Sequence, residues 1–108
     1  VELFAPFRLL AELENNRDEM SGKSGFSLQD FEAFVGILKL RVTFIPLEQF
    51  LDKIPEAKEL APHLKDVEYF ALALKLDCSI WTQENAFKEQ SKVKVFSTSD
   101  LIAFLHGI

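Results

Sequence analysis

The segment from residue 67 to residue 76, VEYFALALKL, restricts the fold most, because it is apolar on nearly every side after its first turn. A helix of this kind is buried between other elements and does not lie on a surface. Short runs typical of strands occur at residues 42–45, 78–81 and 92–96. Strands that alternate with helices indicate an α/β domain with a mostly parallel sheet. We therefore expect a three-layer α/β/α sandwich in which helix 67–76 is the most buried.

Turn and capping signals predict the elements of the first half. A short strand over residues 2–5 ends at Pro6, and an amphipathic helix follows it. The run SGKSG at residues 21–25 predicts a mobile loop. Ser27 and Asp30 resemble a capping box and open a helix that ends near residue 40.

Similar signals continue in the second half. Residues 47–54 and 56–61 fit short helices separated by Pro55. Asp66 is in a suitable place to cap the buried helix. The segment from Ser97 to Asp100 predicts the cap of a last amphipathic helix.

Length and charge limit the kind of protein. The 108 residues allow a single domain, residues 1–108. The 17 acidic residues exceed the 12 basic ones. The resulting net charge of −5 argues against a protein that binds nucleic acid over its whole surface. Cys78 is the single cysteine, which excludes an intrachain disulfide and Cys-rich zinc sites. With no apolar run of about 18 residues and no signal peptide, we expect a cytoplasmic protein without a membrane span.

Three carboxylates fall where a parallel sheet binds ligands, outside the carboxyl ends of its strands. Glu84 follows the strand 78–81, and Asp66 starts the helix that leads into that strand. Glu12 lies at the border of the apolar stripe of its helix. Carboxylates without a cysteine cluster or a suitably spaced histidine pair suit a hard cation such as Mg²⁺ or Mn²⁺.

Four stretches, in this order along nearly the whole chain, carry a resemblance to a known family: Pro6 to Leu13, Asp66 to Leu74, Ile80 to Phe87 and Val93 to Phe104. They contain a P-x-x-L-L-x-E-L start, D-x-x-Y-x-A-L-A-L, W-T-x-acid and V-x-V-x-S. The ordered set resembles the PIN domain family. Its members are α/β/α sandwiches, and many are metal-dependent ribonucleases, including toxins of the VapC type.

The resemblance implies specific roles for the three carboxylates. Glu12 looks like the helical Glu of the family, Asp66 like its helix-start Asp, and Glu84 takes the place of an Asp. It implies that these residues bind Mg²⁺ or Mn²⁺ and cleave phosphodiester bonds of RNA, with a homodimer and an antitoxin protein as further partners. Without the resemblance, Asp66 reads as a helix cap, Glu12 as a solvated charge and Glu84 as a first-turn residue.

Two departures from the family pattern lead to an alternative. The first acidic residue of the family belongs to an N-terminal strand that has no counterpart here, and Glu84 is one methylene longer than Asp. We therefore expect the 108-residue chain alone to be nearly inactive as a nuclease. A non-catalytic PIN-like module for protein contacts is the alternative. A flavodoxin-like domain would need a Gly-rich phosphate loop that the sequence lacks.

The remaining candidates are weaker. Thr82, Lys65 and Lys88, with Lys92 beside them, are candidates for contacts with substrate phosphates, although Thr82 is also a common turn residue. We expect His63 and His106 to be surface residues without a catalytic partner. Trp81 and most of the 11 phenylalanines are expected in the core, with any exposed subset forming a homodimer face.

Overall fold

The structure is a computed structural model that describes residues 2–25 and 27–107, apart from the side chains of residues 20, 24, 104 and 105. The chain divides into two compact units, Val1–Gln49 and Phe50–Ile108, and each has its own pair of parallel strands. The predicted α/β class with parallel strand pairing is confirmed. The described strands form two two-stranded sheets, whereas the sequence led us to expect one larger sheet.

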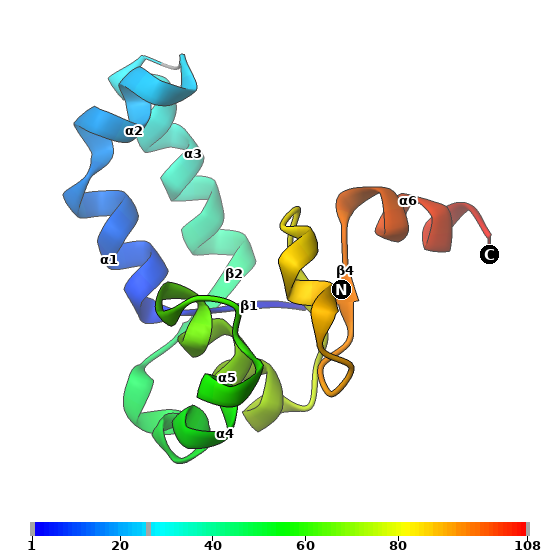
Figure 1. Ribbon diagram of the computed structural model, residues 1–108. Coiled ribbons are helices and arrows are strands. Elements are labelled where there is room, and N and C mark those ends of the chain that lie inside the picture. Colours follow the sequence, from blue (N-terminus) through cyan, green and yellow to red (C-terminus); the bar gives the residue numbers. More distant parts are fainter. Residues whose placement is uncertain (1, 26, 108) are drawn as a thin grey trace. The chain divides into compact units, whose positions relative to one another are not determined.

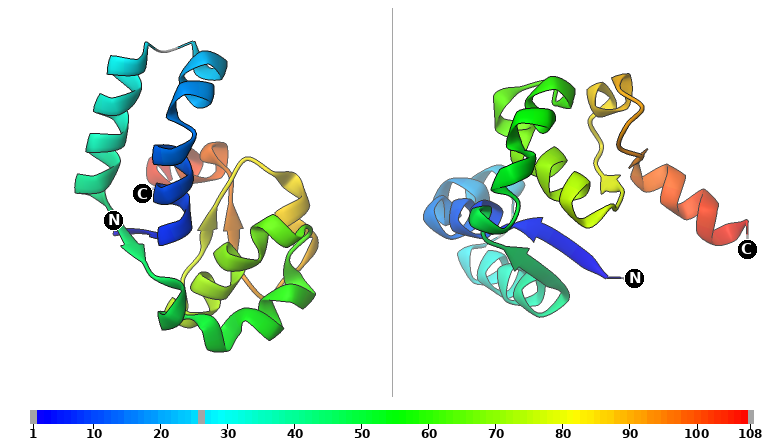
Figure 2. Two further views of the ribbon diagram at one scale, coloured as in Figure 1. Left: turned by 90° about the vertical axis from the view of Figure 1, so that its left-hand side faces the viewer. Right: turned by 90° about the horizontal axis from the view of Figure 1, so that it is seen from below.

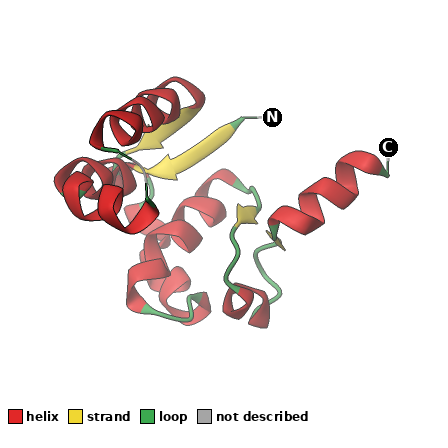
Figure 3. Cartoon of the chain, turned by 90° about the horizontal axis from the view of Figure 1, so that it is seen from above, coloured by secondary structure: helices red, strands yellow, loops and turns green. Residues whose placement is uncertain are grey.

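The first unit is a strand pair with a helical crossover. Its elements are β1 (Leu3–Pro6), α1 (Phe7–Asn15), α2 (Arg17–Ser24), α3 (Leu28–Arg41), β2 (Val42–Ile45) and the 3-10 helix Leu47–Gln49. β1 and β2 lie side by side (Figure 3), paired from Leu3 opposite Val42 to Pro6 opposite Ile45. Parallel strands require a long connection, and α1, α2 and α3 provide it, with α2 packed on α3 (Figure 1).

Local signals explain where these helices begin and end. Ser27 caps α3 as predicted, because its hydroxyl oxygen accepts a hydrogen bond from the backbone N–H of Asp30. The predicted loop at residues 21–25 is wrong for its first four residues, which continue α2. An ion pair between Lys23 and Glu19, one turn apart, supports this last turn of the helix. Only Gly25 leaves the helix, with a φ of 77° that favours glycine.

The second unit contains the predicted buried helix and a second strand pair. Its elements are the 3-10 helix Leu51–Lys53, α4 (Ile54–Leu60), the 3-10 helix Leu64–Asp66, α5 (Val67–Leu76), β3 (Ile80–Trp81), the 3-10 helix Asn85–Glu89, β4 (Val95–Phe96) and α6 (Thr98–His106). β3 and β4 run parallel (Figure 2), with Ile80 opposite Val95 and Trp81 opposite Phe96. Both strands are shorter than predicted.

Helix α5 is the centre of the core of this unit, as its sequence predicts. Five of its ten residues are buried, and among the described residues no other helix buries as many. Phe70 is fully buried, and its ring centroid lies 5.0 Å from that of Phe87. α4 packs along α5 and contributes the fully buried Ala57. These contacts hold in place the loops that precede α5 and follow β3.

Two details of this unit differ from the predictions. Pro55 lies in the first turn of α4 and does not separate two helices, because the first turn needs no N–H from it. Trp81, expected in the core, is 57% exposed. Side chains alternate along a strand, so Ile80 takes the inward position of the two-residue β3 and Trp81 points outward. Ser97 and Asp100 form the predicted capping box at the start of α6.

Candidate metal centre

Asp66 provides a buried carboxylate at the start of α5. Its side chain is only 8% exposed, yet it makes no capping hydrogen bond to the helix. The 3-10 helix Leu64–Asp66 holds the Asp66 backbone in a helical conformation (φ −96°, ψ −7°), whereas a capping side chain needs an extended backbone. The predicted capping role is therefore wrong, and the carboxylate is available for another interaction.

The other end of that short turn places a histidine against this carboxylate. Nδ1 of His63 lies 3.3 Å from Oδ2 of Asp66. The backbone N–H of Asp66 donates to the carbonyl oxygen of His63 over 3.0 Å, so the turn fixes the pair. His63 is exposed as predicted, with 62% of its side chain accessible, but its imidazole contacts a carboxylate that the sequence analysis did not pair with it.

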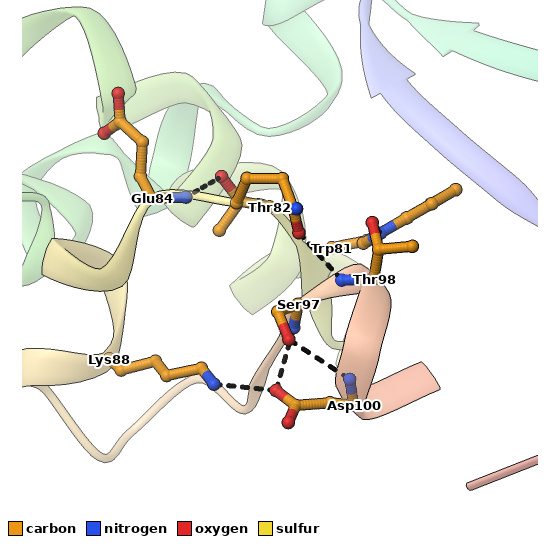
Figure 4. Close-up of polar contacts among 8 residues, drawn as sticks. Trp81, Thr82, Glu84, Lys88, Ser97, Thr98 and Asp100 are labelled. Carbon is orange, nitrogen blue, oxygen red and sulfur yellow. Dashed lines mark hydrogen bonds and ion pairs between the residues drawn. The ribbon is translucent and has the colours of Figure 1, made fainter. Parts of the chain in front are cut away.

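Glu84 completes the cluster from the loop that follows β3. The hydroxyl oxygen of Thr82 accepts a hydrogen bond from the backbone N–H of Glu84 over 3.2 Å. This contact is the turn role considered for Thr82. In Figure 4 the exposed Glu84 carboxylate points away from the Lys88–Asp100 pair. One potential ligand atom from each of His63, Asp66 and Glu84 lies within 4.8 Å of the others.

The donor set of this cluster fits a divalent cation. Two carboxylates and one imidazole offer oxygen and nitrogen ligands from three points of the chain. The buried Asp66 is held by the core, while the exposed Glu84 and His63 have room to adjust. A cation would also offset the repulsion between the two carboxylates, which their proximity otherwise makes unfavourable.

A network of hydrogen bonds fixes the strand ends beside the cluster (Figure 4). Nε1 of Trp81 donates to Oγ1 of Thr98 over 3.1 Å, and the Thr98 backbone N–H donates to Oε1 of Gln83 over 2.8 Å. Asp100 closes the capping box and pairs with Lys88 at 2.7 Å. The Lys88 ammonium, together with hydrogen bonds from Ser97, lowers the pKa of Asp100 to about 2.

The lysines predicted to contact substrate differ in their surroundings. Lys88 pairs with Asp100, and Lys92 pairs with Glu56 at 2.6 Å, which lowers the pKa of the Glu56 carboxyl. Lys65 is exposed in the 3-10 helix that ends at Asp66. A phosphate would have to compete with an acidic partner at Lys88 and Lys92. Lys65 therefore suits a phosphate contact better than these two lysines.

Glu12 lies in the first unit, on α1. Its Oε1 accepts a hydrogen bond from Nε of Arg8 over 3.0 Å in an exposed pair one turn apart. This contact makes Glu12 a solvated charge on the surface of the helix. Its participation in a common site with Asp66 and Glu84 stays a prediction.

The sequence reasoning missed His63. The missed signal is its spacing from Asp66, because residues three apart face each other across one turn of a 3-10 helix. Cys78, the single cysteine, is poorly suited to act as a nucleophile. Partial burial, with the charge of Asp77, raises the pKa of its thiol and keeps the thiolate scarce.

The chain is similar to a known protein family over most of its length. A family model described as a PIN domain matches residues 1–99, which include both units' strands and the whole His63–Asp66–Glu84 cluster. Searches of curated proteins and of solved structures found no match. Among the described residues, no helix is both long and apolar enough to cross a membrane.

Proposed function

The chain belongs to the PIN domain family, a nuclease-type fold, and we propose that it is a divalent-metal-dependent endoribonuclease. The observation that carries the proposal is the buried carboxylate of Asp66, which caps no helix and lies within 4.8 Å of ligand atoms from Glu84 and His63. The proposal of RNA as the substrate comes from the resemblance to ribonucleases of this family.

In this proposal Asp66 and Glu84 hold the cation. A divalent ion bound there lowers the pKa of a water molecule and stabilises the charge that develops on the scissile phosphate. Asp66 acts as the fixed ligand, because burial and the 3-10 turn restrict its side chain. Glu84 reaches the site from the loop after β3, where the Thr82 hydroxyl fixes its backbone.

The test is cleavage of end-labelled single-stranded RNA in the presence of Mn²⁺, using the chain with every residue that its gene encodes. Cleavage should be abolished by EDTA and by Asp66→Asn. Asp52→Asn is the matched control, because Asp52 is an exposed acid of the same unit that pairs with Lys75. Cleavage that survives Asp66→Asn would reject the proposed site. Metal binding without any cleavage would leave the non-catalytic interaction module as the better interpretation.

A further inference from the structure

We propose that His63 is a third, nitrogen ligand of the same cation, and that the site therefore selects divalent transition metals over Mg²⁺. This inference rests on the proposed function and adds a ligand that the sequence pattern did not assign. It concerns the choice of metal by one imidazole, and its test does not depend on whether RNA is cleaved.

The distance between His63 and Asp66 suits two ligands of one ion. Nδ1 of His63 and Oδ2 of Asp66 are 3.3 Å apart. Ligand atoms that each lie about 2.1 Å from one ion are roughly 3.0 to 3.4 Å apart when they occupy neighbouring octahedral or tetrahedral positions. The pair thus has the spacing of neighbouring ligands without further movement.

The backbone keeps this pair in register. His63 is extended (φ −139°, ψ 156°), and the 3-10 helix that follows brings Asp66 back beneath it through the hydrogen bond from Asp66 N–H to His63 C=O. Only the third ligand, Glu84, has to move, because ligand atoms of the cluster lie up to 4.8 Å apart and one ion holds its ligands closer together. Opposite ligands of one ion are separated by at most about 4.2 Å. Glu84 is exposed and long, so it can make this small approach.

The nitrogen donor determines the metal preference. Mg²⁺ prefers oxygen ligands and keeps much of its water, whereas imidazole suits the later first-row ions. Mn²⁺ accepts carboxylate oxygens and imidazole nitrogen together. A site with two carboxylates and one imidazole therefore gains more affinity from His63 for Mn²⁺, Co²⁺ or Zn²⁺ than for Mg²⁺.

The same distance between Nδ1 of His63 and Oδ2 of Asp66 also fits a second role for His63, a hydrogen bond that only orients Asp66. In that case the nitrogen would not contact the ion. His63→Gln separates the two roles, because the glutamine amide can still donate a hydrogen bond to Asp66 but provides no imidazole nitrogen. The chain also supplies a matched control, since its only other histidine is His106 in the last turn of α6.

The experiment is pulsed electron paramagnetic resonance of the Mn²⁺-loaded protein, with Mn²⁺ and Mg²⁺ affinities from calorimetry. We expect ¹⁴N coupling to Mn²⁺ in the unmodified chain and in His106→Gln, and none in His63→Gln. His63→Gln should weaken Mn²⁺ binding by about tenfold or more and change Mg²⁺ binding by less than about threefold, by analogy with the losses seen on altering metal-site partners.

The outcomes distinguish this inference from the proposed function. Bound Mn²⁺ without ¹⁴N coupling, or with coupling that persists in His63→Gln, would overturn the role of His63 and leave the carboxylate site intact. Absence of Mn²⁺ binding at millimolar metal would overturn the proposed site itself, and the inference with it. Equal losses for Mn²⁺ and Mg²⁺ in His63→Gln would contradict the selectivity.

Discussion

Leu72 in α5 offers the sharpest test of the core. The residue is 4% exposed, and Leu72→Ala removes three carbon atoms from its side chain. At about 0.8 kcal/mol per buried methylene, the transfer loss is about 2.4 kcal/mol. The cavity left behind brings the expected loss in the free energy of unfolding to about 2–5 kcal/mol.

Leu74, two residues further along the same helix, is the matched control. Its side chain is half-buried and lines an open pocket, so water can fill the space that Leu74→Ala creates. We expect Leu74→Ala to cost about 1–2 kcal/mol, roughly half of the transfer term or a little more. Both leucines belong to the same apolar run of the sequence, and the structure separates them by their burial.

Urea titration followed by tryptophan fluorescence measures both losses. Trp81 is the single tryptophan and lies in the same unit as α5, so its emission reports on that unit. The midpoints should shift while the slope of the free energy with urea stays constant. A loss below about 0.5 kcal/mol for Leu72→Ala would refute our description of α5 as the buried helix. An equal loss for the two variants would contradict the half-buried position of Leu74.

Three further predictions concern polar contacts. The pKa of Asp100 is lowered to about 2, so the contribution of its carboxylate to stability is complete above about pH 4 and is lost as the pH falls toward 2. In thermal melts, the stability difference between the unmodified chain and Asp100→Asn should therefore shrink over that range. A difference independent of pH would contradict the Lys88–Asp100 pair. Thr98→Val removes the acceptor for the indole N–H of Trp81, which should lower the free energy of unfolding by about 0.5–1.5 kcal/mol and lower the fluorescence anisotropy of Trp81. Unchanged anisotropy would argue against that hydrogen bond. Glu12→Gln should weaken Mn²⁺ binding in calorimetry if Glu12 joins the metal site, and unchanged affinity would remove it from the ligand set.

Signals that act within a few residues were the ones that predicted structure correctly. The apolar run of α5 indicated a buried helix, and Ser27 and Ser97 indicated the starts of α3 and α6. The ordered motifs also led to the correct family. The helix and cap signals depend on side-chain periodicity and local hydrogen bonding, which a sequence displays directly.

Features that depend on neighbouring elements were harder to predict. Asp66 has the sequence position of a cap, but the 3-10 turn before it changes its backbone and releases its carboxylate. Trp81 is of a residue type that is common in cores, but in the two-residue β3 only Ile80 takes the inward position and Trp81 is exposed. His63 becomes a candidate ligand only through that same turn. Tertiary context therefore decides these positions, as expected where propensity is weak.

The most direct test of the central claim is a calorimetric titration of the chain with Mn²⁺, comparing Asp66→Asn with Asp52→Asn. Our account predicts that Asp66→Asn weakens Mn²⁺ binding by at least about tenfold, because the buried ligand is lost. Asp52→Asn should leave the affinity unchanged within about twofold, because its carboxylate pairs with Lys75 outside the cluster. Equal affinities for the two variants would contradict a metal centre at Asp66.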